Sequence, residues 1–115
     1  MNRIDFKEQM RYADTTLNSE RIDDVVVKSL KTFDSANRIG THNLIIVMEE
    51  LGELIQEISK FLRKPNEGTL GLTEELADCY LGIRYVQKAC NISDNDLNKA
   101  INIKTDRQAK RIGGL

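Results

Sequence analysis

Carboxylate side chains recur at spacings of three and four in one stretch of the sequence. Glu50, Glu53 and Glu57 follow one another in this way. On a helix such residues are neighbours, and like charges placed there destabilise the helix. A cation among the carboxylates would offset this repulsion, and Mg²⁺ and Mn²⁺ prefer hard oxygen ligands of this kind. The pattern therefore predicts divalent-metal chemistry.

A second acidic pair, Glu75 and Asp78, lies in the next stretch with helical spacing. On a helical wheel Glu75 falls within the apolar face of that stretch. A carboxylate that faces a core must be protonated, paired or bound to a metal. Arg84 and Lys88, on the same stretch, point to the opposite side. The partner must come from another helix, where the best-placed groups are also acidic, and this predicts a shared metal site.

The acidic residues also have explanations that involve no divalent metal of this kind. Glu-x-x-Glu spacing alone usually marks a solvated helix face, and the inward position of Glu75 is what favours a site. Zinc is disfavoured because His42 is the only histidine and Cys79 and Cys90 are not a close pair. A di-iron bundle needs Glu-x-x-His pairs, which the sequence lacks. The cysteines are too far apart on one helix for a disulfide, and both are predicted to be buried thiols.

Three cations share one side of the C-terminal helical stretch. Lys104, Arg107 and Arg111 follow one another at helical spacing, with Gln108 close by. Like charges so placed repel one another unless anions lie near. Those anions are either the acidic helices or a polyphosphate drawn to both metal and cations. The alternative is a solvated C-terminal turn, where cations favour the helix dipole.

Helical periodicity governs the whole sequence, and no segment shows the sustained alternation of a strand. Pro65 ends one helix, and Ser93 can cap another. The predicted helices are a weak, short one within residues 1–17, Ile22–Asn37, Thr41 to just before Pro65, Leu72–Cys90, and one from Ser93 to Ile112. We expect an all-α protein, a compact four- to five-helix bundle that forms a single domain over residues 1–115.

The apolar residues of the third predicted helix form one arc on the wheel, which we expect to face the core. Its members are Leu44, Val47, Leu51, Leu54, Ile58, Phe61 and Leu62. Glu50 lies at the edge of this arc, with Glu53 and Glu57 beside it. The arc therefore predicts that the acidic residues border the packed side of the helix.

Composition narrows the class of partner. The 115 residues carry 17 basic and 18 acidic side chains, for a net charge of -1, so no global field attracts nucleic acid or anionic lipid. Aromatic residues are only 5%, which disfavours nucleic-acid binding by base stacking. Residues 1–5 lack an apolar signal core, and no apolar run is long enough to span a membrane. We expect a cytoplasmic protein with no nucleic-acid or membrane partner.

The acidic stretches also resemble a known family. Residues 48–54, MEELGEL, and 74–78, EELAD, resemble the Glu-Glu-x-x-Glu and Glu-x-x-Asp signature of the MazG-like, all-α nucleoside-triphosphate pyrophosphatases. Residues 104–111, KTDRQAKR, resemble the Lys-x3-Asn-x2-Arg element of that family, with Gln108 where Asn is usual. The likeness covers residues 41–111. Residues 1–40 match nothing specific and form additional N-terminal helices.

The resemblance implies a role for each matching residue. The implied Mg²⁺ ligands, with Mn²⁺ as substitute, are Glu50, Glu53, Glu75 and Asp78; the phosphate-binding residues are Lys104, Arg107 and Arg111. Glu49 or Glu53 would accept a proton from the attacking water. Gln108 would lie near the base or sugar. His42 is not part of the motif, but on the helical wheel it projects near the sector of Glu49 and Glu53, so it is a candidate base contact; the alternative is a solvated histidine near the start of a helix.

The implied reaction is cleavage of a nucleoside triphosphate between the α- and β-phosphates, which gives a nucleoside monophosphate and pyrophosphate. A dedicated dUTP, dCTP or phosphoribosyl-ATP pyrophosphatase is the alternative within the family. A non-catalytic helical interaction protein is the alternative outside it. The resemblance also implies a homodimer or a homotetramer.

Overall fold

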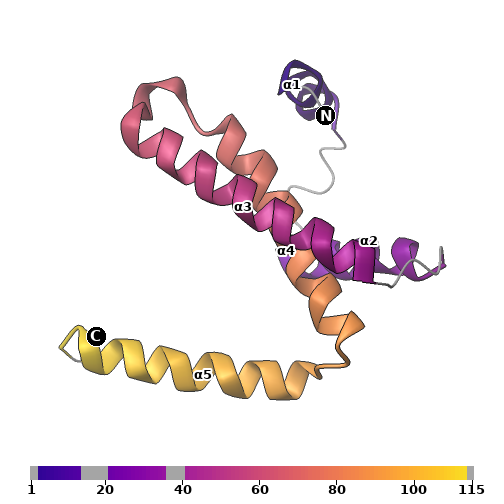
Figure 1. Ribbon diagram of the computed structural model, residues 1–115, viewed down its shortest axis with the longest axis vertical. Helices are drawn as coiled ribbons and strands as arrows, with labels where there is room; N and C mark the ends of the chain where they lie inside the picture. The colour runs from indigo at the N-terminus through magenta and orange to yellow at the C-terminus, as the bar shows by residue number, and fades with distance from the viewer. Residues whose placement is uncertain (1–2, 14–20, 36–40, 114–115) are drawn as a thin grey trace.

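The computed structural model describes residues 3–13, 21–35 and 41–113, and within these ranges every regular element is helical. The elements are α1 (Arg3–Arg11), α2 (Ile22–Ser35), α3 (Thr41–Arg63), the 3₁₀ turn η2 (Pro65–Glu67), α4 (Leu70–Ala89) and α5 (Asp94–Arg111), shown in Figure 1. The all-α prediction is confirmed for the described residues. The predicted bounds of α4 and α5 differ from the observed ones by one or two residues.

A helical hairpin of α3 and α4 forms the centre of the molecule (Figure 1). Pro65 cannot continue α3, and Gly68 has φ +88°, a left-handed conformation that suits glycine and turns the chain back. Gly82 on α4 lies against Val47 on α3. A Cβ at this glycine would lie 3.0 Å from Val47 Cγ1, so the missing side chain is what lets the two helices approach so closely.

The core along this hairpin is thin. Among the residues whose burial the structure describes, the buried apolar side chains are Val26 of α2, Val47 of α3 and Cys79 of α4. Both α1 and α2 contact α4. The Cys79 thiol donates a hydrogen bond to the Glu50 carbonyl oxygen at 3.5 Å and so joins the two hairpin helices. Cys90, by contrast, is exposed, so the prediction that both thiols are buried is wrong for Cys90, which follows the last residue of α4.

The predicted core-facing arc of α3 is divided between two faces. Val47 is buried against Gly82 of α4 and Leu54 is half-buried, whereas Leu51, Ile58 and Leu62 are exposed. The arc prediction is wrong for these exposed residues because α4 covers only one side of α3.

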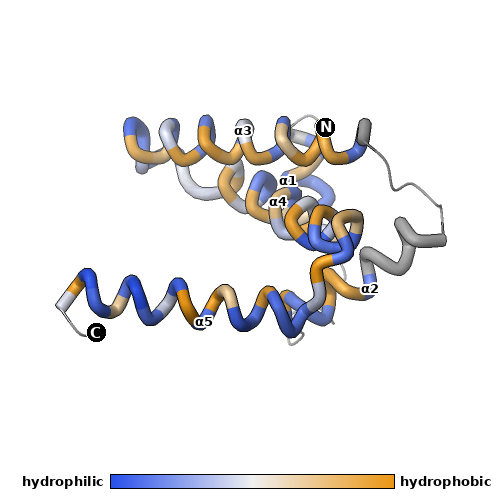
Figure 2. Tube along the Cα trace, turned by 60° about the horizontal axis from the view of Figure 1, so that its bottom comes forward, coloured by the Kyte–Doolittle hydropathy of each residue, from blue (hydrophilic) through white to orange (hydrophobic). Residues whose placement is uncertain are grey.

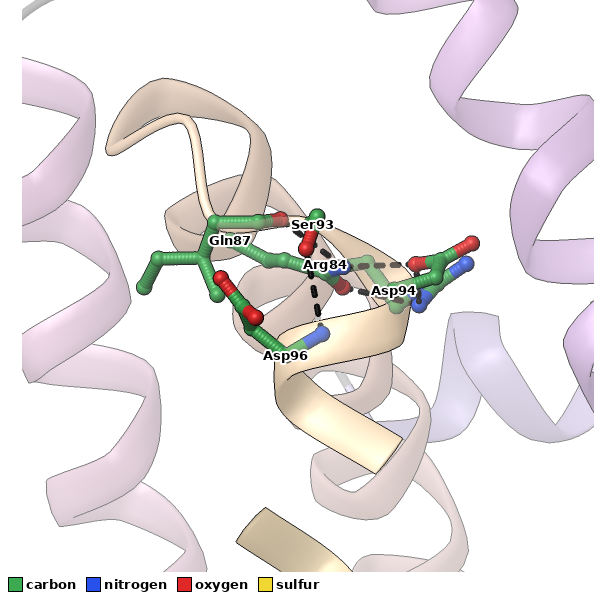
Figure 3. Close-up of polar contacts among 6 residues, drawn as sticks. Arg84, Gln87, Ser93, Asp94 and Asp96 are labelled. Carbon is green, nitrogen blue, oxygen red and sulfur yellow. Dashed lines mark hydrogen bonds and ion pairs between the residues drawn. The ribbon is translucent and has the colours of Figure 1, made fainter. Parts of the chain in front are cut away.

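A polar cluster fixes the start of α5 (Figure 3). Asp94 accepts hydrogen bonds from the Gln87 amide at 2.6 Å and the Arg84 guanidinium at 3.2 Å. These two partners, the Gln87 hydrogen bond first, lower the pKa of the Asp94 carboxyl. Ser93 Oγ accepts the Asp96 N–H at 3.0 Å, which confirms the predicted N-cap. The cluster therefore engages Arg84 with Asp94 at the junction of α4 and α5.

Beyond this junction α5 runs apart from α3 (Figures 1 and 2). The radius of gyration is 16.5 Å, against about 13 Å for a compact domain of this length. The accessible surface is 9217 Å², against roughly 6,400 Å² for a compact protein of 13.1 kDa. The prediction of a compact bundle is therefore wrong for a single chain. Among the described helices, none has the length and apolar character needed to cross a membrane.

Gly82→Ala tests the close packing of the hairpin. Val47 is 7% exposed and β-branched, so it has little freedom to move aside for the added methyl group. We expect a loss of about 1 kcal/mol in the free energy of unfolding, despite the better helix propensity of alanine. Urea denaturation measures this loss. The cost should disappear in a Val47→Ala background, and a stabilised single variant would contradict the packing described.

Candidate metal centre

Three carboxylates meet where α3 and α4 face one another. Glu50 comes from α3, and Glu75 and Asp78 come from α4; one oxygen of each lies within 4.8 Å of the others. Glu75 is 7% exposed, and the other two are half-buried. The inward position predicted for Glu75 is confirmed. Helical spacing explains the meeting, since Glu50 follows Val47 by one turn and Glu75 precedes Cys79 by one turn on the packed faces.

The crowding changes the acidity of the centre. The pKa of the Glu50 carboxyl rises from 4.5 to about 7, because of burial first and then the charge of Asp78 and a hydrogen bond with it, with smaller effects of Glu53 and Glu75. The same burial and charges raise the pKa of the Cys79 thiol. The Oε2 atom of Glu50 is buried and has no hydrogen-bond partner in the described structure. The centre concentrates negative charge that a cation would neutralise.

An acidic cavity of about 560 Å³ opens from this centre. It is lined by Glu50, Glu53, Glu74, Glu75, Ala77 and Asp78, together with Phe6 and Gln9 of α1. Glu53 is exposed and lines the cavity, but it does not belong to the group of three close carboxylates. Glu49 is exposed and lines neither this cavity nor the one beside Tyr85 described next. The α1 residues were missed because nothing in residues 1–40 matches a motif.

A second cavity, of about 280 Å³, lies between α3 and α4. Its lining is mostly apolar: Asn43, Ile46, Val47, Glu50, Asp78, Leu81, Gly82 and Tyr85. Glu50 and Asp78 line both cavities, so the two adjoin at the acidic centre. The Asn43 amide donates to the Tyr85 hydroxyl at 3.2 Å. Both residues were missed, although each lies seven positions from an acidic residue and hence on its helix face.

The predicted cationic residues lie elsewhere in the chain. Lys104, Arg107, Arg111 and Gln108 are all exposed on α5, which runs apart from α3 (Figure 1). The structure therefore does not bring them to the acidic centre of the same chain. His42 is in the first turn of α3, and its side chain lies outside the described part of the structure.

Comparisons with protein-family models, with curated proteins and with solved structures find no match. The likeness to the MazG-like pyrophosphatases therefore rests on the motifs in residues 48–54, 74–78 and 104–111.

The raised pKa of the Glu50 carboxyl predicts an unusual pH dependence of stability. Between pH 4.5 and about 7 the folded protein retains a proton on Glu50 that the unfolded chain releases. Stability of the metal-free protein should therefore fall as pH rises through this range. Thermal unfolding in chelator between pH 5 and 8 measures this fall. Glu50→Gln should flatten the dependence and Glu67→Gln, an exposed control, should leave it unchanged. An equal slope in all three proteins would contradict the crowding of Glu50.

Proposed function

We propose that the acidic centre binds Mg²⁺, with Mn²⁺ as a substitute, and that the protein is a nucleoside-triphosphate pyrophosphohydrolase. The observation that carries the proposal is the meeting of Glu50, Glu75 and Asp78 from two helices. The residues fit the ion, because all the donors are hard oxygens and Glu50 Oε2 is buried without a hydrogen-bond partner. Mg²⁺ is commonly bound by a few carboxylates and substrate phosphates together.

In this proposal each of the two cavities binds a different part of the substrate. The acidic cavity takes the metal and the phosphates, and a bound divalent ion would neutralise phosphate charge and acidify a water molecule. Glu53 lies at this cavity and is the proposed fourth ligand and proton acceptor. Glu49, the other residue suggested for proton transfer, lines neither cavity, so we assign that role to Glu53.

The cavity between α3 and α4 is the proposed site of the base. Its volume of about 280 Å³ is near the lower end of small-molecule pockets, so it suits a base and not a whole nucleotide. Apolar walls with the Asn43 amide and the Tyr85 hydroxyl offer stacking and hydrogen bonding. Cleavage between the α- and β-phosphates then gives a nucleoside monophosphate and pyrophosphate. A dedicated dUTP, dCTP or phosphoribosyl-ATP substrate is the narrower form of the proposal.

The α5 cations require a second chain in this scheme. Lys104, Arg107 and Arg111 are the proposed phosphate-binding residues, and they are exposed on α5, which runs apart from α3 of the same chain (Figure 1). A homodimer or homotetramer, which the motif resemblance also implies, would let α5 of one copy serve the centre of another.

Pyrophosphate release tests the activity. The purified protein with Mg²⁺ is screened against a panel of nucleotides, and pyrophosphate and orthophosphate are measured separately. We expect pyrophosphate from at least one nucleotide, and loss of at least about 100-fold in rate for Glu75→Gln and for Asp78→Asn. Glu67→Gln, with an exposed carboxylate outside both cavities, is the matched control and should retain activity.

The same screen separates the enzyme from a non-catalytic interaction protein. Such a protein would release no pyrophosphate from any nucleotide, and its thermal stability would be indifferent to Mg²⁺. That result, obtained with folded protein, would refute the proposed function.

Mixing two inactive variants tests the shared site. Asp78→Asn removes a ligand and Arg111→Gln removes a cation, so each variant alone should lose activity. If the two residues act from different chains, unfolding and refolding the variants together should restore about a quarter of wild-type activity in a dimer, because half the dimers are mixed and each has one intact site. No recovery in a confirmed mixed dimer would place the site within one chain.

A further inference from the structure

A regular apolar stripe runs along α3. It consists of Leu44, Met48, Leu51, Ile55, Ile58 and Leu62, which we call the α3 stripe. The spacing alternates four, three, four, three, four, which is the spacing of the a and d positions in a coiled coil. The stripe covers most of a helix of 23 residues.

The stripe is largely open to solvent in the single chain. Met48, Ile55 and Leu62 are 70%, 68% and 75% exposed, and Leu51 and Ile58 are also exposed. The α4-facing row is displaced by one residue along the sequence and includes Val47, which is only 7% exposed. Leu44, at the N-terminal end of the stripe, is half-buried, and the other five members are exposed. An exposed apolar row of this length marks an interaction surface.

Gly52 supplies a separate observation on the same face. It lies in the middle of α3, where glycine costs about 0.5–1 kcal/mol relative to alanine. A Cβ built at this glycine would have no heavy-atom neighbour within 4 Å, so no contact within the described chain requires it. Ser59 lies one heptad further along the same flank of the stripe. Two small residues beside an apolar row let another helix approach closely.

We propose that the α3 stripe docks against the α3 stripe of a second copy of this chain, with the two helices antiparallel about a two-fold axis. The spacing between successive stripe residues is the same from either end of the helix, as a self-complementary antiparallel interface requires. Antiparallel pairing then matches Leu44 with Leu62, Met48 with Ile58, and Leu51 with Ile55. The axis passes near Gly52.

The chain as a whole, α5 included, exposes enough surface to supply an interface with a second copy. The accessible surface of 9217 Å² exceeds that of a compact protein of equal mass by roughly 2,800 Å². A standard interface buries about 800 Å² on each partner, so the excess is ample for one. On the helical wheel Glu53 lies on the opposite side of α3 from the stripe, so docking leaves the acidic cavity open.

Self-association without nucleotide tests this surface independently of catalysis. The wild-type protein at micromolar concentration should have at least twice the chain mass of 13.1 kDa by light scattering. Met48→Lys combined with Ile55→Lys should halve the mass while circular dichroism retains the helical signal. Tyr12→Lys, at an exposed tyrosine just after α1, is the matched control and should leave the mass unchanged. A wild-type protein of single-chain mass, or a double variant of unchanged mass, would overturn the proposal.

The antiparallel register is tested by disulfide trapping in a Cys90→Ser background. A mixture of Leu44→Cys and Leu62→Cys chains should yield a cross-linked heterodimer under mild oxidation. Neither variant alone should cross-link, because its two copies of the thiol would lie roughly 27 Å apart along the helix. Cross-linking by each variant alone would indicate parallel helices and overturn the antiparallel arrangement.

Discussion

The close approach of α3 and α4 is the constraint on which the rest of the structure depends. Gly82 removes the side chain that would hold the helices apart, and Val47 packs into the space. The same approach brings Glu50 of one helix to Glu75 and Asp78 of the other. Packing energy from the apolar contacts therefore supports an arrangement of like charges that is unfavourable by itself. Burial of Glu50 between the helices, and then the charge of Asp78, raises the pKa of the Glu50 carboxyl.

The acidic centre lies between two environments of different character. On one side is a cavity with many carboxylates, closed in part by α1; on the other is a smaller cavity with apolar walls. A ligand that spans both needs a charged end that binds metal and an uncharged end that packs against apolar groups. A nucleotide has these two ends, which is why the geometry supports the proposed substrate class.

The helical periodicity of the apolar residues, together with the residues that end or cap helices, was enough to predict the helices and part of the site. Pro65 and Ser93 set helix ends, and the wheel placed Glu75 inward because apolar residues surround it in the sequence. The helical wheel could not show that Glu50 joins the group of three close carboxylates whereas Glu53 does not, since the wheel does not say where the neighbouring helix lies. It also treated the apolar residues of α3 as one arc, whereas α4 covers only the row with Val47. Asn43 and Tyr85 carry no motif, and only the packing of α3 on α4 brings them together.

The junction at Asp94 has a mechanical consequence. Arg84 and Gln87 anchor the first turn of α5 through Asp94, and the whole helix of 18 residues is about 27 Å long. The helix is therefore held in place at its N-terminal end. A tilt of about 10° at the anchor displaces Arg111 at the far end by roughly 5 Å, about one helical turn. The contacts of Arg84 and Gln87 with Asp94, at the junction of α4 and α5, thus determine where the positive charges of α5 are presented.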